Sequence, residues 1–440
     1  MKTGYTNFNE QSIKNFDLIS ESYAAANFLR DKKNFRPFDE GLTELLQKAD
    51  FRGDLSNVCE KTSFLMEKLS AINSKITRKT VLSWFKGERR PKIEPASRPK
   101  MYEICFALNL NLEQVQWFFN HVYYDRMFNC HIISEVVYYY SFMKNLSHDT
   151  ANKIIEEIEA TPAEKNFEGG VVYTQFIKNR VTTFETVAEL KEFLIQNKQF
   201  FATWNKSALD KIQMLFTEIV GDETNCKEIV QKLKRTVEKN RDSNIFFSEE
   251  KINECGLLLR YICRRSRVDK NTGGKYVANE IDDAISGKNI FSHAFVLDNF
   301  LGTLSGIEKE IDVPYILKNN FPAKKILSDV LDENKIGVSK SYDAIRKTLI
   351  LFHFYDFWYK IKLGDVKNLE PEEIENLPEI YREEIDATLV QCGYDRLFAG
   401  NPYDWLFLCS ANSKDPIDSE NFSYAIEFFS HIVGELVDEY

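Results

Sequence analysis

The apolar residues of this chain recur at intervals of three and four positions, and almost no segment alternates apolar and polar residues. The spacing is clear in segments 182–201, 205–220, 226–239 and 248–265. Such intervals place apolar side chains on one stripe of an α-helix, whereas a half-buried strand needs an interval of two. Glycine and proline, which are common in the turns of β-folds, number only 18 and 11 in 440 residues. The sequence therefore predicts an all-α fold.

Charge is distributed unevenly along the chain, whose net charge is −10. Residues 1–150 hold 21 basic and 18 acidic residues, a net of +3, and the remainder, with 36 basic and 49 acidic residues, carries −13. Segment 75–100 alone holds nine basic and two acidic residues, a net of +7. Because an acidic protein repels nucleic acid as a whole, this basic segment is where contact with a polyanion is expected.

A short helix is predicted within the basic segment. Thr77 can cap its N-terminus, since a threonine hydroxyl accepts hydrogen bonds from N–H groups of the first turn. Val81 and Trp84, with Ile76 just before the helix, fall on an inward face, and Phe85 wraps its edge. Gly87 ends the helix, because glycine enters the left-handed conformation without a Cβ clash.

The outward face of this helix carries cations and small polar groups. Such a face suits the DNA major groove, where arginine and lysine side chains donate hydrogen bonds to base edges. The loop GERRPK that follows adds cations that can meet phosphates without reading the sequence. The predicted DNA-binding residues are Thr77, Arg78, Lys79, Ser83, Lys86, Arg89, Arg90 and Lys92.

The segment TVLSWFKGERRP, residues 80–91, resembles the recognition helix and following turn of the lambda-repressor-like (Xre-type) helix-turn-helix family. The shared pattern is an aliphatic residue, a tryptophan three positions later, a glycine, basic residues and a proline. Residues 98–119, RPKMYEICFALNLNLEQVQWFF, resemble the fourth and fifth helices of that family. The resemblance implies that Val81 and Trp84 are core residues. It also implies the groove-facing set Thr77, Arg78, Lys79, Ser83 and Lys86.

Two features depart from the family pattern. The helix before the turn should carry a small residue about ten positions before Val81, where Ala71 stands, but Ser70 and Ser74 then fill normally aliphatic positions. The loop KIEPASRP, residues 92–99, is also longer than usual. A second register, with a longer turn, uses Leu65, Met66 and Leu69 as the core residues.

Four longer segments, MYEICFALNL, VQWFFNHVYYDRMFN, SYDAIRKTLILFHFY and NPYDWLFLCSA, resemble a group of long helix-turn-helix proteins of Clostridia-type bacteria. This resemblance implies an architecture and no particular activity.

Breaks in the helical pattern predict the domain organisation. Residues 1–50 are expected to form an N-terminal arm and a first helix, and residues 51–160 a helix-turn-helix DNA-binding domain. A Pro/Gly-containing break near 160–172 then leads to residues 172–440, a helical region for dimerisation, sensing or an effector role. The loop RVDKNTGGKY predicts a further division of that region near 270–280.

No arrangement of residues in the sequence predicts catalysis. The six histidines never occur at HxxxH spacing, so a zinc site is unsupported. TGGK at 272–275 is not a phosphate-binding loop, because Asp269 stands where the first glycine is required. We therefore expect no enzyme, no metal and no cofactor.

Three other segments leave alternatives open. The segment FNCHIISEVVYYYSF, with His131, is interpreted as aromatic helix packing rather than a metal or stacking site. Residues 338–355, with Arg346 and Lys347, are a weaker candidate for a second helix-turn-helix. Either a solvated helix end or a second anion-binding patch is formed by Arg260, Arg264, Arg265 and Arg267.

The eight cysteines include no CxxC pair, which predicts buried free thiols in a reducing compartment. The N-terminus lacks the apolar core of a signal peptide, and no stretch approaches the roughly 18 uncharged apolar residues that cross a bilayer. A cytoplasmic protein without membrane contact is expected.

The leading hypothesis is a sequence-specific transcriptional regulator whose partner is double-stranded DNA. Segments 343–359 and 422–436 carry more apolar surface than one helical stripe requires, which predicts a homodimer. The alternative is that both segments are central to a large monomeric core. The C-terminal region would also hold a protein partner or a small ligand. The second hypothesis is a DNA-binding or scaffold component of a phage-defence or toxin–antitoxin module.

Overall fold

The computed structural model describes residues 4–16, 18–31, 33–93, 96–162, 174–201, 206–221, 228–229, 248–261, 342–364, 376–413 and 425–437. Helices dominate these residues, and β-structure among them is limited to isolated bridges such as the one between Gly221 and Cys255. The predicted all-α fold is confirmed. None of the helices in the described ranges has the length and apolar character needed to cross a membrane.

The helices of the first 201 residues are α1 (Gly4–Ile13), η1 (Ile19–Glu21), α2 (Ser22–Arg30), α3 (Phe38–Lys48), α4 (Val58–Ala71), α5 (Arg78–Phe85), α6 (Arg98–Ala107), α7 (Leu112–Phe118), the π-helical turn η2 (Phe119–Tyr123), α8 (Ile133–Lys144), α9 (His148–Ala160), α10 (Thr174–Thr182), α11 (Val187–Gln196) and η3 (Lys198–Phe200). Those that follow are α12 (Lys206–Val220), α14 (Glu249–Asn253), α21 (Tyr342–Leu363), α23 (Leu377–Gln391), α24 (Pro402–Ala411) and α25 (Ala425–Val437).

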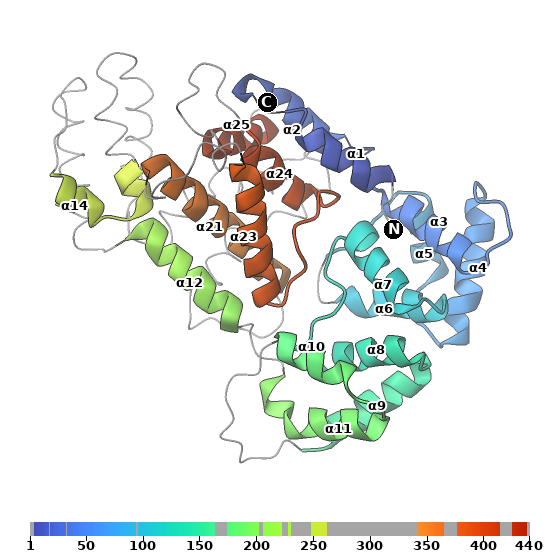
Figure 1. Ribbon diagram of the computed structural model, residues 1–440. Helices are drawn as coiled ribbons and strands as arrows, with labels where there is room; N and C mark the ends of the chain where they lie inside the picture. The colour runs from blue at the N-terminus through green and yellow to red at the C-terminus, as the bar shows by residue number, and fades with distance from the viewer. Residues whose placement is uncertain are drawn as a thin grey trace.

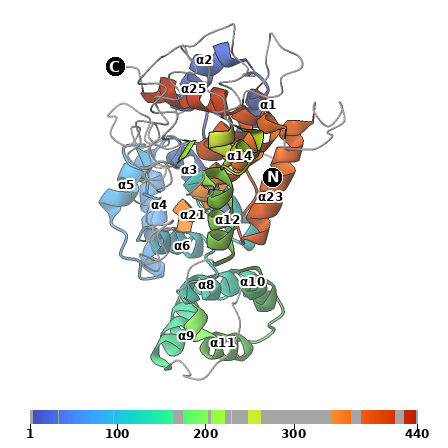
Figure 2. The same cartoon turned by 90° about the vertical axis from the view of Figure 1, so that its left-hand side faces the viewer.

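Two hydrophobic cores organise the described residues. The first contains residues between Phe38 and Phe201, so α3–α7 share it with α8–α11. Both views show α8–α11 as a lobe at one end of the molecule (Figures 1 and 2). The second core joins residues between Ile13 and Phe35 to residues between Ala208 and Leu436. Neither core follows the boundary expected near 160–172: the first continues past it, and the N-terminal arm packs with the C-terminal region.

The first part of the expected N-terminal arm contains α1, η1 and α2, and α2 packs along α25. Figure 1 shows these two ends of the chain side by side. Arg382 on α23 pairs with Glu10 on α1 at 3.0 Å, and Arg30 donates to the backbone carbonyl of Glu435. Helices α1 and α2 therefore pack with the C-terminal core.

Helix α21 lies inside the second core, and its packing bears on the expected homodimer. Leu349, Ile350, Leu351 and Phe352 are consecutive and fully buried, so all sides of the helix are covered within the chain. Apolar residues of α25 also pack into this core. The apolar surface of α21 is therefore covered within the chain and gives no support for a homodimer. A homodimer stays a prediction that rests on paired DNA half-sites alone.

Of the second candidate helix-turn-helix, 338–355, the structure describes residues 342–355, and the two cations there are not available for DNA. The two terminal nitrogens of Arg346, Nη1 and Nη2, donate to the buried carboxylate of Asp404, at 2.8 and 2.7 Å. Lys347 is buried, and its backbone carbonyl accepts a hydrogen bond from the hydroxyl of Tyr403. Of the arginine cluster, Arg264, Arg265 and Arg267 lie outside the described residues, and Arg260 is half-buried.

The tyrosine-rich segment forms α8, and its rings pack as expected. Tyr138 lies against the rings of Tyr102 and Phe106, while Tyr139 contacts Phe128. His131 is buried just before this helix. Five of the described cysteines are buried free thiols, and Cys59 is the exposed exception.

Candidate nucleic-acid interface

Helices α4 and α5 are joined by a turn of residues 72–77, and both views place the pair at the outer edge of the molecule (Figures 1 and 2). The Asn57 side chain caps α4 by accepting hydrogen bonds from two backbone N–H groups of the first turn. Leu65 and Leu69 are fully buried, whereas Ala71 is exposed. The second of the two registers considered for this helix, with the longer turn, is therefore the observed one.

The inner face of α5 is anchored in the first core as predicted. Val81, Trp84 and Phe85 are buried, so Phe85 is a core residue rather than an edge residue. The ring of Trp84 meets the ring of Phe38 edge-on, with centroids 5.7 Å apart. These contacts to α3 fix the rotation of α5 about its axis, and with it the set of residues that faces outward.

Lys61 on α4 lies beneath α5 and ties three helices together. Its ammonium donates to Thr43 Oγ1 on α3 at 3.1 Å and lies 5.2 Å from the centre of the Phe85 ring. Burial lowers the pKa of Lys61, and the negative charge of Asp39 acts in the opposite direction. Burial also raises the pKa of Asp39. Lys61 therefore supports α5 from within and does not belong to the exposed basic surface.

The outer face of α5 carries the side chains predicted to face DNA. Arg78, Lys79 and Lys86 are exposed, and Ser83 is half-buried. Leu82 is also half-buried and, four positions after Arg78, lies in the middle of this face. Sequence reasoning missed Leu82, although its helical position indicates it. The face therefore combines three cations, one hydroxyl and one apolar side chain.

Two of the predicted residues also have local structural roles. The Thr77 hydroxyl accepts a hydrogen bond from the N–H of Thr80 at 3.3 Å, which confirms it as the cap of α5. Arg78 donates to the hydroxyl of Ser63 on α4 at 3.1 Å. The side chains of Thr77 and Arg78 are nevertheless exposed. The Arg78–Ser63 hydrogen bond holds the guanidinium across the gap between the two helices.

A tight loop follows α5 and carries the remaining cations. Gly87 has a φ of +67°, the left-handed conformation expected of it. The N–H groups of Glu88 and Arg89 both donate to the carbonyl of Ser83, at 3.1 and 3.3 Å, which turns the chain back sharply. The side chains of Arg89 and Lys92 are exposed. This loop extends the basic surface beyond the end of α5.

Arg90 does not belong to that surface, and its prediction as a phosphate contact is corrected. Its guanidinium donates to the carbonyls of Val122 and Tyr123, at 3.0 and 2.8 Å, and lies over the ring of Tyr124. These carbonyls end the π-helical turn η2, where backbone acceptors lack partners within the helix. Arg90 therefore fastens the loop to η2.

Arg98 is a second cation of the basic segment that the fold has buried. It forms ion pairs with Glu135, at 2.6 Å, and with Asp125, and it also donates to the hydroxyl of Tyr102. Burial opposes ionisation of Glu135, but the charge of Arg98 holds the pKa of this carboxyl below its usual range. The cations that stay exposed are Lys75, Arg78, Lys79, Lys86, Arg89, Lys92 and Lys100.

Comparison of the chain with protein-family models, with curated proteins and with solved structures gave no match. The site is therefore interpreted from its own geometry. In the described ranges no group of three or more His, Cys, Asp or Glu side chains could hold a metal ion. What the α4–α5 pair offers chemically is a rigidly supported row of hydrogen-bond donors and positive charge.

Proposed function

We propose that this protein is a sequence-specific regulator that binds double-stranded DNA through the major groove with α5. The observation that carries the proposal is the division of α5 into a buried face, Val81 and Trp84, and an exposed face with three cations. A helix-turn-helix inserts its second helix in this way, with the N-terminal residues of that helix at the base edges. The resemblance of residues 80–91 to the lambda-repressor-like family supports the same function.

The exposed face of α5 supplies donors suited to base recognition. Arg78 and Lys79 occupy the first turn, from which their side chains reach the O6 and N7 acceptors of guanine. Ser83 lies one turn later; its hydroxyl donates to the carbonyl of Thr80 at 2.8 Å and keeps lone pairs that accept a hydrogen bond from a base. Leu82 offers an apolar surface to the methyl group of thymine. This combination of side chains favours binding to a particular base sequence over equal binding to all DNA sequences.

The cations at the end of α5 are suited to phosphates. Lys86, Arg89 and Lys92 are exposed, and none lies in the first turn. Contacts with phosphates position a protein on the duplex and contribute most of its non-specific affinity. The acidic remainder of the chain repels DNA, which confines the contact to this side of the molecule.

Selection from a pool of random double-stranded DNA, followed by titration of the enriched sequence at several salt concentrations, tests the proposal. If each protomer neutralises about four to six phosphates, log affinity falls with log salt at a slope of about −4 to −5 per protomer. Lys14→Gln, which removes an exposed lysine just after α1, is a matched control and should bind as the unaltered protein does. Undetectable binding, or binding that salt does not weaken, contradicts the proposal.

A further inference from the structure

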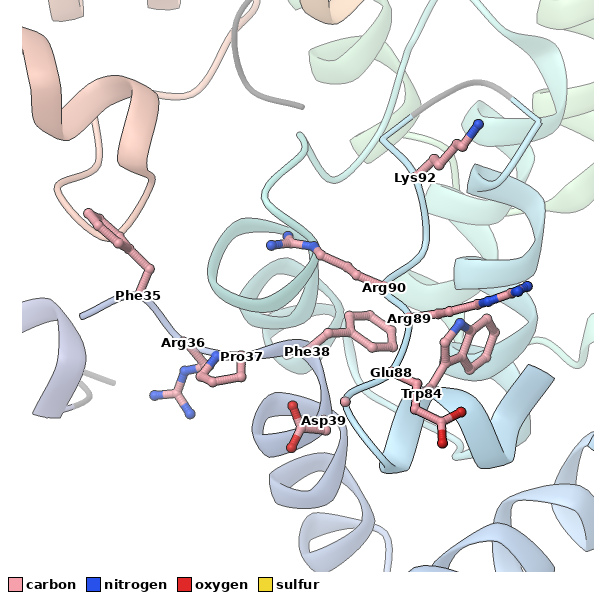
Figure 3. Close-up of a pocket in the computed structure, with 11 residues that line it drawn as sticks. Phe35, Arg36, Pro37, Phe38, Asp39, Trp84, Glu88, Arg89, Arg90 and Lys92 are labelled. Atoms are coloured by element: carbon pink, nitrogen blue, oxygen red, sulfur yellow. The ribbon is translucent and has the colours of Figure 1, made fainter. Parts of the chain in front are cut away.

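A cavity of about 490 Å³ lies beside the loop that leaves α5. Residues 35–39, from the end of the linker after α2 and the start of α3, line one part of it, and Trp84 with residues 87–90 and 92 line the rest. Figure 3 shows these two segments and the side chains of the lining residues. The volume falls within the range of pockets that take small organic ligands.

Aromatic and aliphatic side chains supply much of the cavity wall. Phe35, Pro37, Phe38 and Trp84 all line it. Phe38 and Trp84 are held edge to face, and both are buried in the first core. The apolar wall is therefore rigid, and its rings suit a flat aromatic ligand.

The charges around the cavity leave two cations available for a ligand. Arg36 is paired with Glu44, and Arg90 is held by the carbonyls of η2. By contrast, Arg89 and Lys92 make no side-chain hydrogen bond or ion pair with any residue in the described ranges. They border an apolar cavity and therefore attract a negatively charged group.

The acidic residues of the cavity do not cancel this attraction. Glu88 forms an ion pair with Lys86, at 3.4 Å. Asp39 lies opposite Gly87 and is half-buried; burial raises its pKa, and the positive charge of Lys61 acts on the same carboxyl group and offsets part of its negative charge. The two exposed cations thus remain the strongest local attraction for an anion.

We propose that this cavity binds a small planar aromatic ligand that carries an anionic group. The ring packs against Phe38 and Trp84, and the anion binds Arg89 and Lys92. A mononucleotide and an aromatic carboxylic acid share this chemistry, and they are the two sources to be distinguished.

Binding of such a ligand would oppose binding of DNA, and this second step rests on the proposed function. Arg89 and Lys92 are the same cations that are proposed to contact phosphates. A cation that binds the ligand's anion is withdrawn from the DNA backbone, so each partner weakens the other by the same factor. The cavity would therefore make DNA binding responsive to a small anion.

Calorimetric titration of the full chain, without DNA, tests ligand binding. The probes are adenosine monophosphate and indole-3-acetate, and their neutral counterparts are adenosine and indole-3-acetamide. At least one anion should bind about ten-fold or more tightly than its neutral counterpart, because a charged hydrogen bond is strong at an apolar site. Whichever anion binds identifies the source. Absence of binding by both anions at millimolar concentration, or equal binding of the neutral compounds, overturns the inference.

Two variants test where the anion binds. Arg89→Gln and Lys92→Gln should each weaken binding of the anionic probe about ten-fold, while Lys100→Gln, which removes an exposed cation outside the cavity lining, should not. All three positions are exposed, so the variants should unfold at the same temperature as the unaltered protein. Unchanged binding in both cavity variants overturns the assignment.

Competition with DNA tests the second step separately. At ten times the Kd of the probe, the apparent Kd for DNA should rise about ten-fold. If the probe binds and DNA affinity is unaffected, the coupling is wrong and the cavity site stands. If the probe binds but no DNA sequence does, the proposed function fails and the site stands. If DNA binds and neither probe does, the function stands and the site fails.

Discussion

Phe28 on α2 stacks on Trp405 of α24, with ring centroids 4.8 Å apart and ring planes 17° from parallel. The indole N–H of Trp405 also donates to the hydroxyl of Ser12 on α1, at 2.9 Å. Two helices near the start of the chain thus meet one buried side chain near its end. The short linker that follows α2 leads directly into α3 and the α4–α5 pair, so the proposed DNA-binding surface is physically tied to the C-terminal core.

Trp405 should therefore be essential for stability. Trp405→Ala removes a fully buried indole and should lower the free energy of unfolding by about 3–5 kcal/mol. Trp405→Phe keeps a ring but removes the hydrogen bond to Ser12, at a cost of about 1 kcal/mol. Tyr23→Ala, at an exposed position of α2, is the control and should stay within about 0.5 kcal/mol. Chemical denaturation measures all three, and equal stability of Trp405→Ala and Tyr23→Ala would contradict the packing described.

Local signals in the sequence were sufficient to predict α5. A threonine cap, two apolar positions three apart and a terminal glycine all act within one or two helical turns, and each was found where expected at Thr77, Val81, Trp84 and Gly87. The outward direction of Arg78, Lys79 and Lys86 follows from the same spacing.

The roles of Arg90 and Arg98 could not be predicted, because their partners are distant in sequence. Arg90 binds carbonyls more than thirty residues away, and one partner of Arg98 is Glu135. A count of charges cannot separate such arginines from solvated ones. For a similar reason α21 suggested a dimer interface: a helix that is apolar on all sides can be covered within one chain or by a second copy, and only the tertiary fold distinguishes them.

The first turn of α5 and the loop that follows this helix should respond differently to mutation. Arg78→Ala and Lys79→Ala should each cost about 1–3 kcal/mol on the preferred DNA sequence, and should relax the preference at one base pair. Arg89→Ala should weaken binding to all sequences alike, because phosphates do not differ between sequences. Binding to the preferred site and to its single-base variants measures the difference. A uniform loss in all three variants would show that the first turn of α5 does not read bases.

Leu82 provides a further test of the same face. Leu82→Ala should reduce discrimination at a thymine of the site, with a cost of about 1 kcal/mol on the preferred sequence, the scale of one buried methyl group. The comparison is made with the preferred site in which that thymine is replaced by uracil, which lacks the methyl group. The unaltered protein should lose affinity for the uracil site, and Leu82→Ala should not distinguish the two. If Leu82→Ala loses as much on uracil replacement as the unaltered protein does, Leu82 does not contact the methyl group.

Arg89 and Arg90 are adjacent, but substitution of Arg90 should affect stability, whereas substitution of Arg89 should affect DNA binding. Arg90→Gln leaves the carbonyls of Val122 and Tyr123 without their donor and should lower stability by about 1–3 kcal/mol. Arg89→Gln changes an exposed side chain and should leave stability within about 0.5 kcal/mol while weakening DNA binding. Thermal unfolding and DNA titration of both variants separate the two roles. If Arg90→Gln is fully stable and loses only DNA affinity, the sequence-based prediction that Arg90 contacts a phosphate is correct.

Buried histidines should make the fold sensitive to mild acid. Burial lowers the pKa of His131 from the ordinary 6.5 to about 4, and that of His353 to about 3. Each histidine therefore stabilises the fold in its neutral form. This stability is fully present above pH 6.5 and is lost as the pH falls towards the lower pKa, because the unfolded chain takes up the proton first.

For His131 the loss between pH 7 and pH 5 should be roughly 2 kcal/mol, from the linkage between protonation and unfolding. His131→Gln cannot take up this proton. Between pH 7 and pH 5 its free energy of unfolding should therefore fall by roughly 2 kcal/mol less than that of the unaltered protein, whatever its value at pH 7. His431→Gln, at an exposed position of α25, should keep the pH dependence of the unaltered protein. Urea denaturation at pH 7, 6 and 5 gives the three curves. Identical pH dependence in His131→Gln and the unaltered protein would mean that His131 reaches solvent in the native state, so that its protonation does not favour unfolding.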